Sequence, residues 1–149
     1  MMSDLRELYQ QTILDHHRKP RNFRPLADAN RTAEGFNPLC GDQITLSLRV
    51  EDGVIADAAF QGAGCAIARA SASMLTGGVI GLRREEAEAL FRRVHAMLTG
   101  EANGGVADLG KLAVFAGVRE FPSRIKCVTL AWHTLRAALA GATEPVSTE

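Results

Sequence analysis

The stretch QITLSLRVEDGVIADAAF, residues 43–60, decides the fold class of this chain. Apolar and polar residues alternate strictly from Gln43 to Val50, which predicts a strand with one buried face. Asp52-Gly53 separates this strand from a second apolar run, Val54 to Phe60. An Asp-Gly pair between two such runs is a strong β-hairpin signal. The sequence therefore predicts an antiparallel hairpin, whose second strand ends where the Gly-rich residues 61–64 begin.

Helical patterns lie on both sides of this hairpin, and most of them follow it. Before it, residues 3–18 have the spacing of an amphipathic helix, and residues 31–36 are a short run compatible with a strand. After it, segments with helical character occur at residues 65–75, 84–98, 109–115 and 124–140. Strands that come first and helices that come later indicate an α+β fold, with a sheet packed against helices. The helix at 65–75 is expected to end at Gly77-Gly78, and the tail at 142–149 is expected to fray.

Length and composition are those of one soluble globular domain that spans residues 1–149. Of the 149 residues, 46% are apolar and 23% are charged, and 17 basic residues balance 17 acidic ones. This balance excludes the broad basic surface of a non-specific nucleic-acid binder. No apolar run approaches the roughly 20 residues needed to cross a bilayer, and the first residues lack the apolar core of a signal peptide. We therefore expect a cytoplasmic protein with no nucleic-acid or membrane partner.

Three cysteines, Cys40, Cys65 and Cys127, carry the candidate chemistry. Their odd number and wide separation do not fit a disulfide framework, which leaves reactive or metal-bound thiols. Cys40 is two residues before Asp42, a spacing that places both side chains on one face of an extended chain. Cys65 follows a Gly-rich turn at the start of a helix, and Cys127 is expected in the first turn of the last helix. The helix dipole favours thiolates at such positions.

Three thiolates and one carboxylate form a tetrahedral donor set that suits Zn²⁺ or an iron–sulfur cluster. Arg124 and Lys126 flank Cys127 and would offset the negative charge of such a site. Spacing alone leaves a second interpretation open, in which the three cysteines are buried as small apolar residues.

Several short motifs make the chain resemble the IscU/NifU-N family, and more closely its SufU branch. These motifs are Asn-Pro-x-Cys-Gly-Asp at Asn37–Asp42, Gly-x-Gly-Cys at Gly62–Cys65 and Arg-Ile-Lys-Cys at Arg124–Cys127. The resemblance extends over nearly the whole chain, from Leu5 to Ala140. It implies an α+β fold in which a small antiparallel sheet, three-stranded in that family, packs against about five helices. It also implies that the three cysteines converge beside Asp42.

The resemblance further implies a function in iron–sulfur cluster biogenesis. In IscU-type scaffolds a His directly precedes the third cysteine, whereas here that residue is Lys126, which favours the SufU role. That role is a zinc-dependent sulfurtransferase, with Zn²⁺ held by Cys40, Asp42, Cys65 and Cys127. A PLP-dependent cysteine desulfurase of the SufS type would release Cys40 from the metal with a His of its own and pass persulfide sulfur to it.

Two other functions stay open at this point. The first is a scaffold on which an iron–sulfur cluster is assembled and passed to apo-proteins, which would add downstream cluster-assembly proteins as partners. The second is an adaptor whose metal is purely structural. The scaffold predicts a labile cluster that can be transferred intact to an apo-acceptor, whereas the adaptor predicts partner binding that survives a Cys40→Ser change.

Overall fold

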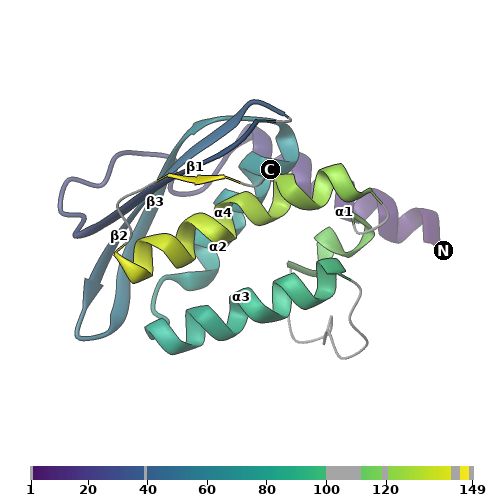
Figure 1. The fold of residues 1–149 in the computed structure, drawn as a ribbon. Helices are drawn as coiled ribbons and strands as arrows, with labels where there is room; N and C mark the ends of the chain where they lie inside the picture. The colour runs from purple at the N-terminus through teal and green to yellow at the C-terminus, as the bar shows by residue number, and fades with distance from the viewer. Residues whose placement is uncertain (1, 39, 100–111, 119–120, 142–144, 148–149) are drawn as a thin grey trace.

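The predicted hairpin is present in the structure (Figure 1), a computed structural model that describes residues 2–38, 40–99, 112–118, 121–141 and 145–147. Its strands are β2 (Asp42–Glu51) and β3 (Val54–Ala63). The turn residues Asp52 and Gly53 have φ angles of 51° and 78°. Positive φ at both central positions gives the turn whose twist matches that of an antiparallel pair. The Asp-Gly signal is therefore confirmed.

Two more strands, β1 (Arg31–Asn37) and β4 (Val146–Ser147), complete the four-stranded sheet that the described residues form, in the order β3-β2-β1-β4. β1 is antiparallel to β2, and β4 is parallel to β1. The sheet thus has one strand more than the three expected. The tail that was expected to fray supplies this strand, because Val146 and Ser147 pair with Gly35 and Phe36. A two-residue strand has no recognisable pattern of its own, since its formation depends on the neighbouring strand.

Four α-helices are present in the described ranges: α1 (Met2–Arg18), α2 (Ala66–Val79), α3 (Arg84–Thr99) and α4 (Pro122–Ala140). Residues 112–118 add a 3₁₀ segment, while residues 109–111 of the predicted helical turns lie outside the described residues. Figure 1 shows α2 and α4 against one face of the sheet, α1 beside α2, and α3 on the side of α4 away from the sheet. The α+β class is confirmed. None of the described helices is both long and apolar enough to cross a membrane.

Two helix boundaries differ from the prediction by more than one residue. α2 continues through Gly77 and Gly78 to Val79. A Cβ at either glycine would meet no atom within 4 Å, and the extra turn buries the Val79 side chain completely. This burial outweighs the low helix propensity of glycine. α4 begins two residues before Arg124, at Pro122, a residue type favoured in the first turn of a helix.

The apolar face of the sheet packs on α2 and α4. Ile44, Leu46 and Leu48 of β2 are at most 4% exposed, which confirms the predicted alternation. Val50 is half-buried, because the register between β2 and β3 shifts beside it. One cluster of buried apolar residues joins this face to both helices, and it includes Leu75 of α2 and Leu130 and Trp132 of α4.

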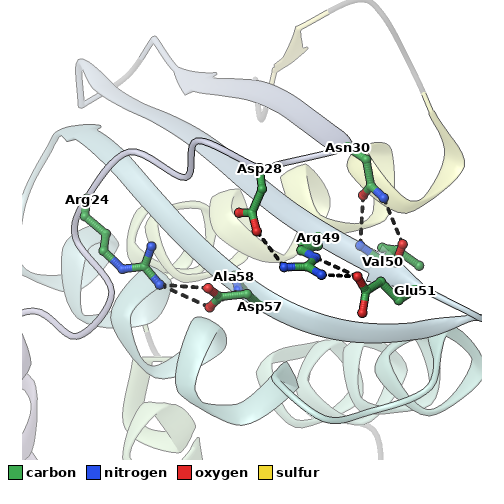
Figure 2. Close-up of polar contacts among 8 residues, drawn as sticks. All are labelled: Arg24, Asp28, Asn30, Arg49, Val50, Glu51, Asp57 and Ala58. Atoms are coloured by element: carbon green, nitrogen blue, oxygen red, sulfur yellow. Dashed lines mark hydrogen bonds and ion pairs between the residues drawn. The ribbon is translucent and has the colours of Figure 1, made fainter.

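Ion pairs connect a loop and two strands on the opposite face of the sheet (Figure 2). Arg24 donates to both carboxylate oxygens of Asp57 in β3, at 3.0 and 3.1 Å. Arg49 of β2 lies between Asp28 and Glu51 and donates to both carboxylates. Exposed pairs of this kind each contribute about 0–1 kcal/mol. The pairs of Arg24 with Asp57 and of Arg49 with Asp28 connect the loop before β1 to the sheet.

Asn30 attaches the same loop to the sheet through backbone groups (Figure 2). Its side-chain amide donates to the Val50 carbonyl at 2.8 Å, and the Val50 N–H donates back to Oδ1 at 2.8 Å. The Asn30 N–H also donates to the Leu48 carbonyl at 2.9 Å. The side chain thus acts as a strand partner at the point where the register of β2 shifts.

A small aromatic cluster joins α3 to α4. Phe91 and His95 of α3 stack with ring centroids 6.0 Å apart, and the His133 ring of α4 meets the Phe91 ring edge-on at 5.2 Å. The Arg136 guanidinium lies over the Phe91 ring, 5.5 Å from its centroid. Burial lowers the pKa of His133, and the positive charges of His95 and Arg136 lower it further.

Gly35 marks a close crossing between β1 and α4. A Cβ there would clash with Oγ1 of Thr134 and lie 3.1 Å from Cδ1 of Leu130. Gly35→Ala is therefore expected to lower the free energy of unfolding by about 1–3 kcal/mol, the usual effect of overpacking, as measured by urea unfolding. Gly78→Ala is the matched control, because it adds the same methyl group where no atom lies within 4 Å. It is expected to raise stability by about 0.5–1 kcal/mol, and equal effects from the two variants would contradict the tight crossing.

The shift at His133 predicts that the free energy of unfolding falls as the pH is lowered. The unfolded chain takes up a proton here near the ordinary pKa of about 6.5, whereas the folded chain takes it up at a lower pH. Between these two values the unfolded state binds more protons, so acidification favours unfolding. Above the unfolded pKa this contribution does not change with pH.

His133→Phe tests this prediction, because it keeps an aromatic ring beside Phe91 and removes the titrating group. The variant should lose less stability than the unaltered protein between about pH 8 and about pH 5.5. Both proteins are unfolded with urea in the presence of a chelator, which excludes loss of bound metal as the cause of a difference. Identical pH slopes for the two proteins would disprove the prediction.

Candidate metal centre

The three cysteines and Asp42 come from four different places in the fold. Cys40 is exposed in the turn between β1 and β2, and Asp42 is the fully buried first residue of β2. Cys65 is the half-buried N-cap residue of α2. Cys127 is buried in the second turn of α4, one turn later than expected, because the helix begins at Pro122.

These four side chains converge beyond the end of β1. The Sγ atoms of Cys40 and Cys127 are 3.5 Å apart. With a carboxylate oxygen of Asp42 they form a group of three ligand atoms within 4.8 Å of one another. The Sγ of Cys65 lies 3.8 Å from Oδ2 of the same carboxylate. The interpretation of three cysteines buried as apolar residues is wrong for Cys40, which is exposed.

A tight turn after Asn37 places Cys40 near Asp42. The Asn37 carbonyl accepts hydrogen bonds from the N–H groups of Cys40 and Gly41, at 3.3 and 2.9 Å. Gly41 has a φ of 71°, which glycine adopts without strain. Asn37 and Asp42 then pair as the last residues of the β1–β2 ladder. The two ligand groups therefore meet through a turn, and not through the extended spacing that the sequence suggests.

Two glycines let the connection from β3 to α2 pass close to Asp42. β3 continues beyond its predicted end through Gly62, where a Cβ would clash with the Gln43 carbonyl oxygen of β2. At Gly64 a Cβ would lie 2.9 Å from Oδ1 of Asp42. That oxygen accepts the Cys65 N–H at 2.8 Å. The Gly-x-Gly-Cys motif therefore reflects a close approach of two chain segments.

Burial raises the pKa of the Cys127 thiol, and the neighbouring Cys40, Cys65 and Asp42 raise it further. The expectation that a helix start lowers this pKa is wrong, because Cys127 lies beyond the first turn and among acidic groups. As a thiol it donates a weak hydrogen bond to the Ser123 carbonyl, at 3.7 Å. Three thiols and one carboxyl group this close together cannot all be deprotonated unless a cation lies among them.

The donor set fits a tetrahedral metal ion. Asp42 is 0% exposed, and no basic side chain in the described ranges forms an ion pair with it. A buried carboxylate without a counter-charge is unfavourable, and a bound cation would supply that counter-charge. Three sulfurs and one oxygen suit Zn²⁺ and also iron.

The basic residues next to Cys127 lie outside this cluster. Arg124 is exposed and Lys126 is half-buried, and neither forms an ion pair with another residue in the part of the chain that the structure describes. The function of Arg124 as a counter-charge stays a prediction.

Asn37 has a position in the cluster to which the sequence alone assigns no role. It is 0% exposed, and its Nδ2 donates to Sγ of Cys127 at 3.9 Å. Its place at the start of the Asn-Pro-x-Cys-Gly-Asp motif is the sequence feature that points to it.

Two known proteins with similar sequences cover most of this chain. The iron–sulfur cluster assembly scaffold protein IscU of Streptococcus pyogenes serotype M1 is 41% identical over 138 residues, which are 93% of this chain and 86% of the relative. The zinc-dependent sulfurtransferase SufU of Bacillus subtilis is 38% identical over 138 residues, 93% of each chain. The two identities are too close to decide between the two functions.

A solved structure and a family model agree with these relatives. The structure is described as an iron–sulfur cluster assembly scaffold protein for the SUF system, FiSufU, of the thermophile Fervidobacterium islandicum AW-1. It has a TM-score of 0.82 and 32% identity, and the match covers 86% of this chain and 93% of that one. The family model for the NifU-like N terminal domain matches residues 8–140. The chain therefore belongs to the NifU-like N-terminal domain family, which includes the IscU and SufU proteins of iron–sulfur cluster assembly.

Proposed function

We propose that this chain is a zinc-dependent sulfurtransferase that accepts persulfide sulfur on Cys40 from a PLP-dependent cysteine desulfurase of the SufS type. The observation that carries this proposal is the asymmetry of the cluster. Cys40 is exposed in a turn, whereas Cys127 is 0% exposed within a helix and Cys65 caps one. A sulfur carrier needs a thiol that can reach the persulfide of its partner, and Cys40 meets this requirement best.

Zn²⁺ is held in this proposal by Cys40, Asp42, Cys65 and Cys127. The short distances among their ligand atoms and the buried, uncompensated carboxylate support this set. When bound, zinc supplies positive charge that keeps the sulfurs deprotonated at neutral pH, against the raised pKa of Cys127. The relative from Bacillus subtilis, whose name describes it as zinc-dependent, supports the choice of metal.

Sulfur transfer to Cys40 has the chemistry of thiol–disulfide exchange. The Cys40 thiolate attacks the outer sulfur of the desulfurase persulfide, so that a new S–S bond forms on Cys40. The original S–S bond breaks, and the desulfurase cysteine leaves as a thiolate. The sulfur keeps its oxidation state, so the step needs no external oxidant or reductant. Cys40 lies in a turn that is closed by backbone hydrogen bonds, and not in a helix. Its side chain is therefore better able than those of Cys65 and Cys127 to move toward the persulfide.

A scaffold function is the second candidate. The relative from Streptococcus pyogenes, at 41% identity, is named a scaffold protein. Lys126 speaks against that function here, because it stands where the resemblance to IscU-type scaffolds implies a His ligand. A lysine ammonium is protonated at neutral pH and has no lone pair for a metal. We therefore favour the sulfur-acceptor function.

Metal analysis combined with a desulfurase assay tests this proposal. Freshly purified protein is expected to contain about one zinc per chain and no acid-labile sulfide. It is expected to stimulate a SufS-type desulfurase, and mass spectrometry should find the added sulfur on Cys40. Cys40→Ser should abolish both the stimulation and the sulfur loading, because the hydroxyl cannot replace the thiolate nucleophile.

A matched pair of variants controls for the loss of a carboxylate. Asp42→Asn should lower the zinc content, whereas Asp57→Asn, in an ion pair with Arg24 on the outer face of the sheet, should not. Iron and sulfide in comparable amounts would favour the scaffold. Full stimulation by Cys40→Ser would rule out the acceptor function and leave the adaptor with a structural metal.

Removal of zinc with a chelator is expected to lower the thermal midpoint of unfolding. A ligand at about 1,000 times its Kd stabilises the folded state by about 4 kcal/mol, which corresponds to about 8–16 °C for a chain of this length. Addition of Zn²⁺ should restore the midpoint, and Mg²⁺ should not, because it prefers oxygen ligands. Equal midpoints with and without chelator, measured by calorimetry, would show that the cluster holds no stabilising metal.

A further inference from the structure

Asn37, the last residue of β1, contacts both the turn that carries Cys40 and the sulfur of Cys127. Its backbone carbonyl accepts hydrogen bonds from the N–H groups of Cys40 and Gly41, at 3.3 and 2.9 Å. Its side-chain Nδ2 donates to Sγ of Cys127 at 3.9 Å. Asn37 also pairs with Asp42 across the β1–β2 ladder. One buried residue thus adjoins three of the four groups proposed to hold the metal.

The side-chain contact has the polarity that a metal-bound sulfur requires. Metal-bound cysteine is a thiolate, which accepts hydrogen bonds and has no proton to donate. The contact of Cys127 with the Ser123 carbonyl at 3.7 Å needs a thiol proton and is lost when the metal binds. The contact with Asn37 needs an N–H donor and a sulfur acceptor, and it strengthens when the sulfur is charged. Of the side chains that the structure describes, Asn37 alone donates an N–H to a cysteine sulfur.

We propose that Asn37 is a positioning residue of the metal centre. Its amide holds the Cys127 sulfur in its ligand position, and its carbonyl holds the turn from which Cys40 reaches the metal and the partner. This inference rests on the proposed function only for the presence of a metal on these four groups. Hydrogen bonds to ligand atoms commonly change metal affinity by about 10–100-fold.

Zinc competition against a chromophoric chelator tests the proposal on the full chain. Asn37→Ala removes the donor and is expected to weaken zinc binding by about 10–100-fold. Asn37→Asp keeps the size of the side chain but places a carboxylate oxygen against the sulfur, so it should weaken binding at least as much. Both effects should persist in variants whose metal-free thermal midpoint is close to that of the unaltered protein.

Asn30→Ala is the matched control. Asn30 also binds backbone groups of the sheet through its side chain, at 2.8 Å to Val50, but it lies on the loop before β1. Its substitution should lower the thermal midpoint and leave zinc affinity unchanged. Unchanged zinc affinity in both Asn37 variants, or loss of the fold in both, would assign Asn37 to the stability of the fold and overturn the inference.

The absorption spectrum of the cobalt-substituted protein provides a second test. A substitution that affects only the stability of the fold would not change this spectrum. Loss of an N–H donor raises the energy of the sulfur lone pairs, so the sulfur-to-cobalt charge-transfer band of Asn37→Ala should shift to longer wavelength. An unshifted band would count against the proposal.

The same experiments separate this inference from the proposed function. Weaker zinc binding by the Asn37 variants, in a protein that does not stimulate a desulfurase, would support the positioning role and reject the sulfur-acceptor function. Stimulation that depends on Cys40, with equal zinc affinity in all variants, would support the sulfur-acceptor function and reject the positioning role of Asn37. An unaltered protein that binds no zinc would reject both.

Discussion

The hydrogen bond from the Cys65 N–H to the buried Asp42 carboxylate is the interaction on which the cluster depends. It joins the first residue of β2 to the start of α2, 23 positions later, at a distance of 2.8 Å. The backbone comes this close because Gly64 has no side chain, and a Cβ there would lie 2.9 Å from the same oxygen. Hydrogen bonds to an ionised carboxylate are stronger than neutral ones. This contact therefore orients an oxygen donor and a sulfur donor together.

The packing of α2 on α4 fixes the position of the buried Cys127 sulfur. The Ser71 hydroxyl of α2 donates to the Val128 carbonyl of α4 at 2.6 Å, and both groups are buried. Cys127 directly precedes that carbonyl, so the spacing of the two helices sets its distance from Cys65. Cys40 has no such support and is held by the turn after Asn37. The fold thus places three of the proposed ligand groups on a strand, on a helix or at the N-cap of one, and the fourth, Cys40, in a turn.

Local patterns predict more of this fold than of its site. The hairpin follows from alternation and from the Asp-Gly turn, because neither needs a distant contact. The pairing of β4 with Gly35 and the extension of α2 past Gly78 depend on neighbouring elements, so the sequence does not reveal them. Cysteine spacing alone leaves the convergence of the site open, and the resemblance to a family implies it. The raised pKa of Cys127 and the contact of Asn37 arise from burial, which no local pattern contains.

Short segments lie along both edges of the sheet, and this affects how a partner can bind. β4 pairs with Gly35 and Phe36 at one edge, and Phe23 forms a bridge to Phe60 of β3 at the other. An uncovered edge strand presents unpaired N–H and C=O groups, to which another chain can add as a further strand. At these positions strand addition is blocked. A protein that approaches the sheet at these positions therefore has to recognise the shape and charge of side chains and cannot add a strand to the backbone there.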